Sequence, residues 1–121
     1  MRLRALRGAI TVDANDADTI LEGTEELVRT VMERNALSPE DIVSCIFTAT
    51  PDLDAEFPAV AARRLGLNAV PLICAREIDV PDALPRVIRL MVHCYADDGA
   101  PAQHVYLREA ARLRRDLEGA Q

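Results

Sequence analysis

The residues Leu72-Ile73-Cys74-Ala75-Arg76-Glu77-Ile78-Asp79 form the stretch around which the rest of the chain is organised. An apolar run that begins at Val70 is typical of a buried strand, and it gives way to Arg, Glu and Asp. Such polar side chains often belong to binding sites, because the strand fixes their positions. Arg89 follows ten residues after Asp79. The stretch therefore predicts a binding site beside a strand end.

Length and composition indicate one domain, since 121 residues leave no room for a second core. Half of the residues are hydrophobic but only 3% are aromatic, so the core must be aliphatic. No apolar run approaches the roughly 20 residues of a membrane span, and the N-terminus has no cleavable apolar segment. We expect a soluble cytoplasmic protein without a membrane partner.

The charge and the cysteines exclude further classes. A net charge of −6 argues against nucleic acid as a partner, because phosphate binding needs a basic face. All 14 basic residues are arginines, so an anion site must use guanidinium groups. Cys45, Cys74 and Cys94 have no zinc-binding spacing with the two histidines, so no metal site is expected. Cys45 and Cys94 are interpreted as buried reduced thiols.

The hydrophobic pattern predicts alternating strands and helices. The expected strands are 2–12, 42–50, 70–75 and 103–107; the expected helices are 19–34, 59–65 and one that begins at Pro81, with the apolar stripe Leu84, Val87, Ile88, Met91, Val92 and Tyr95. This order predicts an α+β fold with α/β layering, in which a mixed sheet is covered by helices on one side. Arg89 and Leu90 fall off the last helical stripe, which suggests that a second subunit covers that side.

The chemistry that these residues support is limited. The chain contains no dinucleotide fingerprint, P-loop or nucleophile elbow. Cys74 could be a nucleophile but has no obvious histidine partner, and Glu77 with Asp79 could be a carboxylate pair without the facing geometry of an acid–base dyad. Arginines at element ends, with Glu77 and Tyr106, favour binding of a small dianion and stabilisation of charge.

Several motifs together resemble one enzyme family. They are Arg4-Ala5-Leu6-Arg7-Gly8-Ala9-Ile10-Thr11-Val12, Thr48-Ala49-Thr50-Pro51-Asp52-Leu53, Phe57-Pro58-Ala59, Val70-Pro71, Cys74-x-x-Glu77-x-Asp79-Val80, Ile88-Arg89 and His104-Val105-Tyr106-Leu107. In order and spacing the chain resembles the monofunctional AroH-class chorismate mutases. The resemblance extends to about Leu117, which gives one domain over 1–117 and a tail at 118–121 that is expected to be mobile.

The resemblance implies a homotrimer of α+β subunits, with a chorismate-mutase-II-like fold, a pseudo-barrel core and active sites between neighbouring subunits. The implied reaction is the Claisen rearrangement of chorismate to prephenate, on the route to Phe and Tyr. The implied enzyme selects the compact diaxial conformer and stabilises negative charge on the breaking ether oxygen. The only ligand expected is this small molecule, and no cofactor is needed.

The resemblance also assigns roles to residues. Arg89 would donate to the ether oxygen, Arg7 and Tyr106 would hold a carboxylate, and Glu77 with the Cys74 backbone would meet the ring hydroxyl. Further substrate-binding residues would be Phe57, Ala59 and Arg63 across the cleft, Leu72, Ile73, Ala75 and Arg76 along its wall, and Leu113 and Arg114 in a closing tail. Ile73 and Val60 depart from the frequent Thr and Lys of the family.

Two other classes of protein compete with this interpretation. A non-catalytic trimer that senses a small carboxylate would keep Arg7 but would not need Arg89 and Glu77 at these spacings. A purely structural subunit would need none of these three residues.

Overall fold

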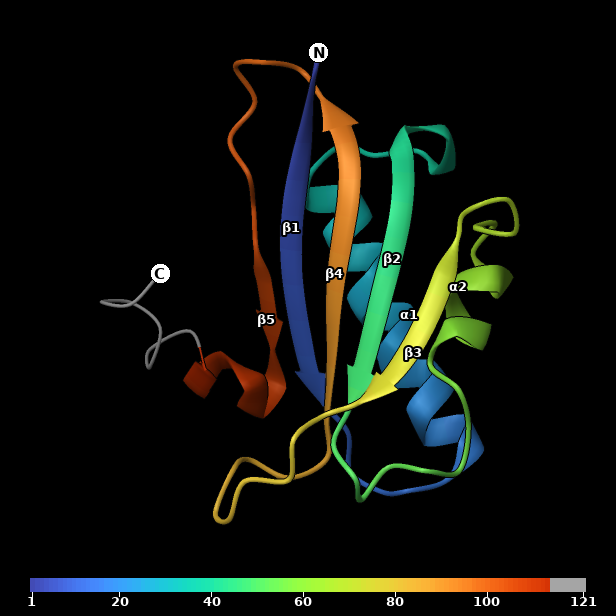
Figure 1. Ribbon diagram of the computed structural model, residues 1–121, viewed down its shortest axis with the longest axis vertical. Coiled ribbons are helices and arrows are strands. Elements are labelled where there is room, and N and C mark those ends of the chain that lie inside the picture. Colours follow the sequence, from blue (N-terminus) through green and yellow to red (C-terminus); the bar gives the residue numbers. More distant parts are fainter. Residues whose placement is uncertain (114–121) are drawn as a thin grey trace.

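Five strands form one mixed sheet in the order β3-β2-β4-β1-β5. The computed structural model describes residues 1–113 (Figure 1). Its elements are β1 (Arg2–Thr11), α1 (Ala17–Arg34), the 3-10 turn η1 (Pro39–Asp41), β2 (Ile42–Ala49), α2 (Ala59–Arg64), β3 (Leu72–Arg76), β4 (Val87–Ala96), β5 (Val105–Leu107) and the 3-10 turn η2 (Arg108–Ala110). The expected tail at 118–121 lies outside the described residues.

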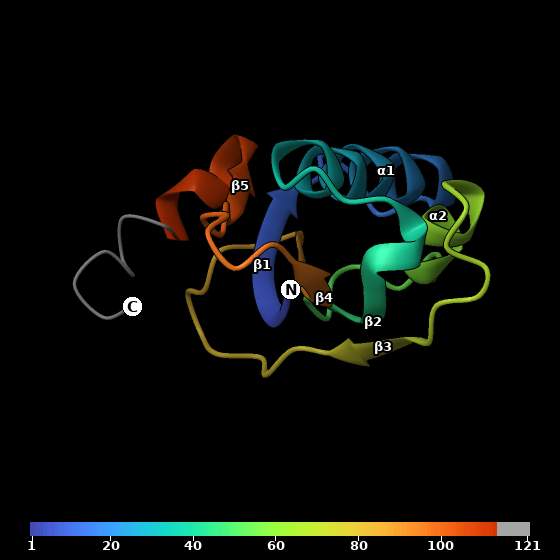
Figure 2. The same cartoon turned by 90° about the horizontal axis from the view of Figure 1, so that it is seen from above.

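The sheet is covered on one face, as the sequence predicts. β4 pairs antiparallel with both β1 and β2, while β3 runs parallel to β2 and β5 parallel to β1. Both α1 and α2 lie on the same side of this sheet (Figure 2). We call the opposite side the open face: neither α1 nor α2 lies on it, although Ala110 of η2 and Leu113 pack against Ala9 and Val87 at one end of it.

The alternation of β1 decides which side chains meet the helices. Leu6 and Ile10 are buried, and a Cβ built on Gly8 would lie 3.0 Å from the Leu27 Cδ1 of α1. The even-numbered positions of β1 therefore face α1. Arg7 and Ala9 point to the open face, since successive side chains of a strand alternate between its two sides.

The predicted stripe of α1 is confirmed, and its N-terminus is capped. The Asp16 side chain accepts a hydrogen bond from the Thr19 backbone N–H at 2.8 Å. This bond holds the pKa of the Asp16 carboxyl below its usual value, because it stabilises the ionised form. The buried positions, including Ile20, Leu27 and Val31, form the face that packs on the sheet.

The predicted helix from Pro81 through Tyr95 is wrong, because residues 87–96 form the central strand β4. Apolar residues occupy the positions of one helical face and also the alternate positions of a strand, so the pattern fits both a helix and a strand. Burial follows the strand period: Ile88, Leu90, Val92 and Cys94 are buried on the helix-covered face. Tertiary pairing with β1 and β2 decides the structure here, since a central strand satisfies its backbone groups on both sides.

The strand predicted over 70–75 exists as β3, but it is not buried. It lies at the edge of the sheet, paired only with β2, and Ile73 is 58% exposed. An apolar edge strand has the composition of a buried one, so composition alone could not place it. Its exposed apolar side chains form the kind of surface that often marks an interaction site.

Two of the three cysteines lie inside the core, as predicted. Cys45 and Cys94 are buried and form no disulfide. Burial raises the pKa of the Cys45 thiol to about 12 and raises that of Cys94 as well, because the apolar surroundings penalise the thiolate. Both thiols are therefore poor nucleophiles.

Within residues 1–113, no helix has the length and apolar character that a bilayer span requires.

Gly23 of α1 lies close to Val12, the residue that follows β1, and it tests this packing. A Cβ on Gly23 would lie 2.5 Å from the Val12 Cγ1, a contact that forces the helix away from the strand. We expect Gly23→Ala to lower the free energy of unfolding by about 1–2 kcal/mol, despite the better helix propensity of Ala. Thermal and denaturant unfolding measure this. Gly99→Ala is the matched control, because nothing lies within 4 Å of its Cβ position; equal effects of both changes would contradict the packing.

Candidate active site

Side chains from four neighbouring strands meet at the middle of the open face. Arg89 of β4 lies opposite Ala9 of β1 on one side and opposite Thr48 of β2 on the other. Tyr106 of β5 is paired with Ala9 and so lies on the same face. The difference between the predicted helix and the observed strand β4 matters here, because the strand places Arg89 in the centre of the sheet rather than on a covering helix.

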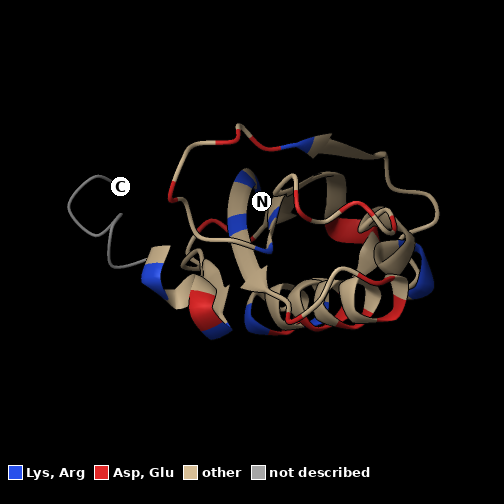
Figure 3. Cartoon of the chain, turned by 90° about the horizontal axis from the view of Figure 1, so that it is seen from below, with Lys and Arg blue, Asp and Glu red and all other residues tan. Residues whose placement is uncertain are grey.

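Charge is unevenly distributed around this face. Figure 3 shows blue positions along β1 and red positions along the loop between β3 and β4, with further red positions on α1. The loop contributes Glu77, Asp79 and Asp82, of which Glu77 is half-buried and the other two are exposed. Glu77 is therefore the acid placed to act at the open face.

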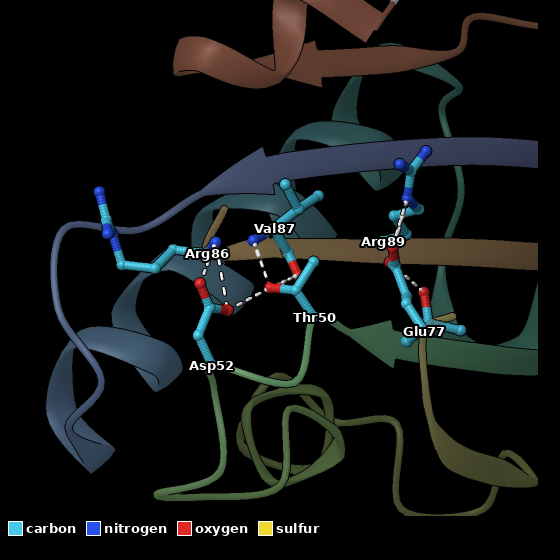
Figure 4. A network of polar contacts seen from close by, with 7 residues as sticks. Thr50, Asp52, Glu77, Arg86, Val87 and Arg89 are labelled. Carbon is cyan, nitrogen blue, oxygen red and sulfur yellow. Dashed lines mark hydrogen bonds and ion pairs between the residues drawn. The ribbon is translucent and has the colours of Figure 1, made fainter. Parts of the chain in front are cut away.

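Arg89 and Glu77 form an ion pair (Figure 4). The Arg89 Nε donates to both carboxylate oxygens of Glu77, at 3.1 Å to Oε1 and 3.0 Å to Oε2. The Glu77 side chain is 14% exposed, whereas that of Arg89 is 42% exposed. Among residues 1–113, the two terminal nitrogens of Arg89 have no hydrogen-bond partner. This part of the guanidinium group is available to a ligand.

Glu77 is attached to β2 at two points. Its backbone N–H donates to the Ala49 carbonyl at 2.9 Å, and its Oε2 accepts a hydrogen bond from the Thr48 hydroxyl at 2.7 Å. The residue stands immediately after β3, which runs parallel to β2. The end of the sheet thus fixes both the backbone and the carboxylate.

A cavity of about 200 Å³ opens on this face. Its lining includes Arg7, Ala9, Thr48, Arg89 and Tyr106. Two guanidinium groups, one phenol and one hydroxyl thus surround an otherwise apolar hollow, which suits a small anion. The structure brings together Arg7, Arg89 and Tyr106, three of the predicted site residues, and Glu77 through its pairing with Arg89.

A second cavity of about 240 Å³ lies at the edge of the sheet and holds other predicted residues. Phe57, Cys74, Ala75 and Arg76 line it, and Phe57 is 68% exposed. Thr48 borders both cavities. The predicted site residues thus divide into two groups within one chain.

Other predicted residues lie apart from both cavities. Ala59 is buried in the core at the start of α2, and Arg63 is exposed in the last turn of that helix. Leu72 packs against the core, while Ile73 lies on the open face. Leu113 is half-buried against the cluster of Ala9, Val87 and Ala110. Arg114 lies outside the described residues.

A hydrogen-bonded network fixes the start of β4 (Figure 4). The Asp52 carboxylate accepts hydrogen bonds from the Thr50 hydroxyl and from the Arg86 backbone N–H, the latter at 3.0 Å to Oδ2. The Thr50 hydroxyl in turn accepts from the Val87 N–H at 3.0 Å. Arg86 has a φ of 52°, a left-handed conformation that is costly for a non-glycine residue. The network stabilises the turn that leads into β4 and thus into Arg89.

Thr48 is the site residue that the sequence reasoning missed. It belongs to the motif Thr48-Ala49-Thr50-Pro51-Asp52-Leu53, which assigns no role to its hydroxyl. The available signal was its position on β2, two residues before the strand's predicted end at Thr50. The carboxylate pair that the sequence left open finds no support in the contacts, because Glu77 pairs with Arg89 rather than with Asp79.

The family is established by comparison with known proteins. A model of the family described as chorismate mutase type I matches residues 3–117 of this chain. The chain belongs to the chorismate mutase type I family. This description replaces the type II label that the resemblance attached to the fold, while the resemblance to the AroH class is confirmed.

Individual relatives cover nearly the whole chain. It is similar to the chorismate mutase AroH of Thermus thermophilus, with 48% identity over 98% of this chain and 99% of that protein. It is 41% identical to the chorismate mutase AroH of Bacillus subtilis strain 168, over 97% and 94% of the two chains. A solved chorismate mutase from Clostridium thermocellum matches with a TM-score of 0.87 and 46% identity, over 90% of this chain and 98% of that chain. The predicted α+β fold is confirmed by this match.

Proposed function

We propose that this chain converts chorismate to prephenate through its Arg89, Glu77, Arg7 and Tyr106 side chains. Family membership makes the chain a chorismate mutase, which is an isomerase. The observation that carries the proposed roles is the position of Arg89: its Nε is held by Glu77, and its terminal nitrogens remain available beside a cavity.

The rearrangement is unimolecular, so the enzyme needs to hold one conformer and stabilise charge. Arg7 and Tyr106 bind a carboxylate of the substrate, and Glu77 accepts a hydrogen bond from its hydroxyl. These contacts favour the compact diaxial conformer, in which the reacting carbons approach each other. Arg89 then donates to the ether oxygen as negative charge develops there, a contact that strengthens in the transition state. No step transfers a proton to or from a side chain.

The functional unit proposed is a homotrimer with sites between subunits. The open face supports it, because Leu3, Ile46, Ile73 and Tyr95 leave apolar surface exposed: their exposed fractions are 54%, 37%, 58% and 46%. The division of the site residues between two cavities supports it too, since the Phe57 side of one subunit can complete the Arg89 side of the next. Covering the face also removes water from Arg89 and strengthens its contact with the substrate.

We propose a cytoplasmic location and a reaction without cofactor, as the rearrangement needs only bound substrate. The non-catalytic carboxylate sensor is not favoured, since a carboxylate sensor would not need the Glu77–Arg89 pair.

Arg89→Ala tests the central role in catalysis. Loss of the donor to the ether oxygen should reduce kcat by a factor of about 100 or more, equivalent to about 3 kcal/mol. The assay follows the decrease in chorismate absorbance with purified protein. Arg29→Ala, at an exposed position of α1, is the matched control and should leave turnover unchanged. Unimpaired turnover by Arg89→Ala would remove Arg89 from its role.

The pH dependence of the reaction tests the absence of acid–base catalysis. We expect kcat to be constant from about pH 6 to 9, because arginine stays protonated throughout this range. Steady-state rates in constant-ionic-strength buffers measure it, with circular dichroism at each pH to show that the fold is intact. A bell-shaped profile within this range would indicate a titrating acid or base and would contradict the mechanism.

Mixed assemblies test whether the sites lie between subunits. Arg89→Ala and Arg63→Ala should each be nearly inactive alone, because each removes one side of every site. After the two variants are unfolded and refolded together in equal amounts, about a quarter of the sites should combine two intact sides, and activity should return to that fraction. Sedimentation should give a mass about three times the 13.3 kDa of the chain. No recovery in a mixed trimer would contradict sites shared between subunits.

A further inference from the structure

Thr48 contacts the Glu77–Arg89 pair in a way that the proposed mechanism leaves unused. Its hydroxyl donates to the Glu77 Oε2 at 2.7 Å, which is shorter than either contact of that carboxylate with Arg89. Hydrogen bonds to ionised acceptors are among the stronger ones in proteins, and short O–H···O⁻ distances are typical of them. Thr48 also borders both cavities.

Arg89 alone does not fix the rotation of the Glu77 carboxylate. The Nε lies almost equally far from the two oxygens, at 3.1 Å and 3.0 Å, so this contact holds the position of the carboxylate more firmly than its twist about the Cγ–Cδ bond. The last torsion of a glutamate side chain is also broad and nearly two-fold. A second donor on one side of the carboxylate fixes this twist, and the Thr48 hydroxyl provides it.

The hydroxyl of Thr48 is itself well placed to do this. β2 lies between β3 and β4 in the sheet, and Thr48 is paired with Ala75 on one side and Arg89 on the other. The branched Cβ restricts the first side-chain torsion, so the hydroxyl has few alternative positions. The same strand holds the Glu77 backbone through the Ala49 carbonyl.

We propose that Thr48 is a positioning residue that orients the Glu77 carboxylate through its hydroxyl, and thereby aims the terminal nitrogens of Arg89 into the cavity. By occupying Oε2, Thr48 leaves the lone pairs of Oε1 that face away from Arg89 for the substrate hydroxyl. In this role Thr48 acts through Glu77 and Arg89 rather than on the reacting atoms. The inference rests on the proposed function, since it takes Glu77 and Arg89 as the groups that act on the substrate.

The test is a double-mutant cycle of Thr48→Val with Glu77→Ala, measured as kcat and KM for chorismate. Valine keeps the shape of threonine and its strand propensity while removing the hydroxyl. We expect Thr48→Val alone to reduce kcat about tenfold, with KM changed less than about threefold, since the aim of Arg89 matters most in the transition state. In the Glu77→Ala background the same change should alter kcat by less than about twofold, because no carboxylate remains to be oriented.

Two further variants separate positioning from general damage to the fold. Thr48→Ser restores the hydroxyl and should recover kcat to within about threefold of the wild type. Thr30→Val is the matched control on α1, where the hydroxyl donates to the Glu26 carbonyl of the same helix, and it should leave kcat unchanged. Circular dichroism and thermal unfolding check each variant, and Thr48→Ala replaces Thr48→Val if the latter does not fold.

The outcomes distinguish this inference from the function on which it rests. A wild-type protein that does not consume chorismate would overturn both. If the wild type is active and Thr48→Val retains its kcat within about twofold, only the role of Thr48 is overturned. Equal losses from Thr48→Val with and without Glu77, or no recovery in Thr48→Ser, would overturn it as well, because the effect would then not pass through the carboxylate.

Discussion

The ion pair between Arg89 and Glu77 is the interaction on which the rest of the site depends. A half-exposed ion pair contributes little to the free energy of unfolding, so its importance lies in how it orients the Arg89 side chain. Glu77 holds the Nε, and among residues 1–113 the two terminal nitrogens of the guanidinium group have no hydrogen-bond partner beside the cavity that Arg89 lines. The backbone of both partners is held in place. Arg89 lies in the central strand, and the Glu77 backbone N–H donates to the carbonyl of Ala49. Preorganisation of this kind lets a donor act without first losing freedom.

The topology of the sheet explains why the site lies where it does. β4 comes late in the chain yet is inserted between β1 and β2, so Arg7, Thr48 and Arg89 come from three neighbouring strands although they are far apart in sequence. Both α1 and α2 cover the same face, which leaves most of the other face to these side chains and to the proposed neighbouring subunits (Figure 2). The same exposed apolar surface that would be a liability in a monomer thus serves the proposed assembly and encloses the site.

Much of this arrangement could be predicted from sequence, and the errors have physical reasons. Alternation placed Arg7 correctly on β1, and the stripe of α1 was unambiguous because charged residues fill its other side. The stretch around Arg89 has apolar residues at the spacing of a helix and also at the spacing of a strand, so its sequence predicts a helix where pairing with β1 and β2 makes a strand. For β3, the apolar composition does not distinguish an edge strand from a central strand. The pairing of Glu77 with Arg89, and the Thr48 hydroxyl beside it, depend on contacts between strands that no local pattern encodes.

The central claim is that Glu77 aims Arg89 at the oxygen where charge develops. The most direct measurement is a crystal structure of the protein with a bicyclic ether dicarboxylate that mimics the cyclic transition state. The account predicts a terminal nitrogen of Arg89 within about 2.7–3.1 Å of the ether oxygen, with the Nε still on Glu77. An ether oxygen turned away from Arg89, or an Arg89 bound only to a carboxylate of the ligand, would contradict it.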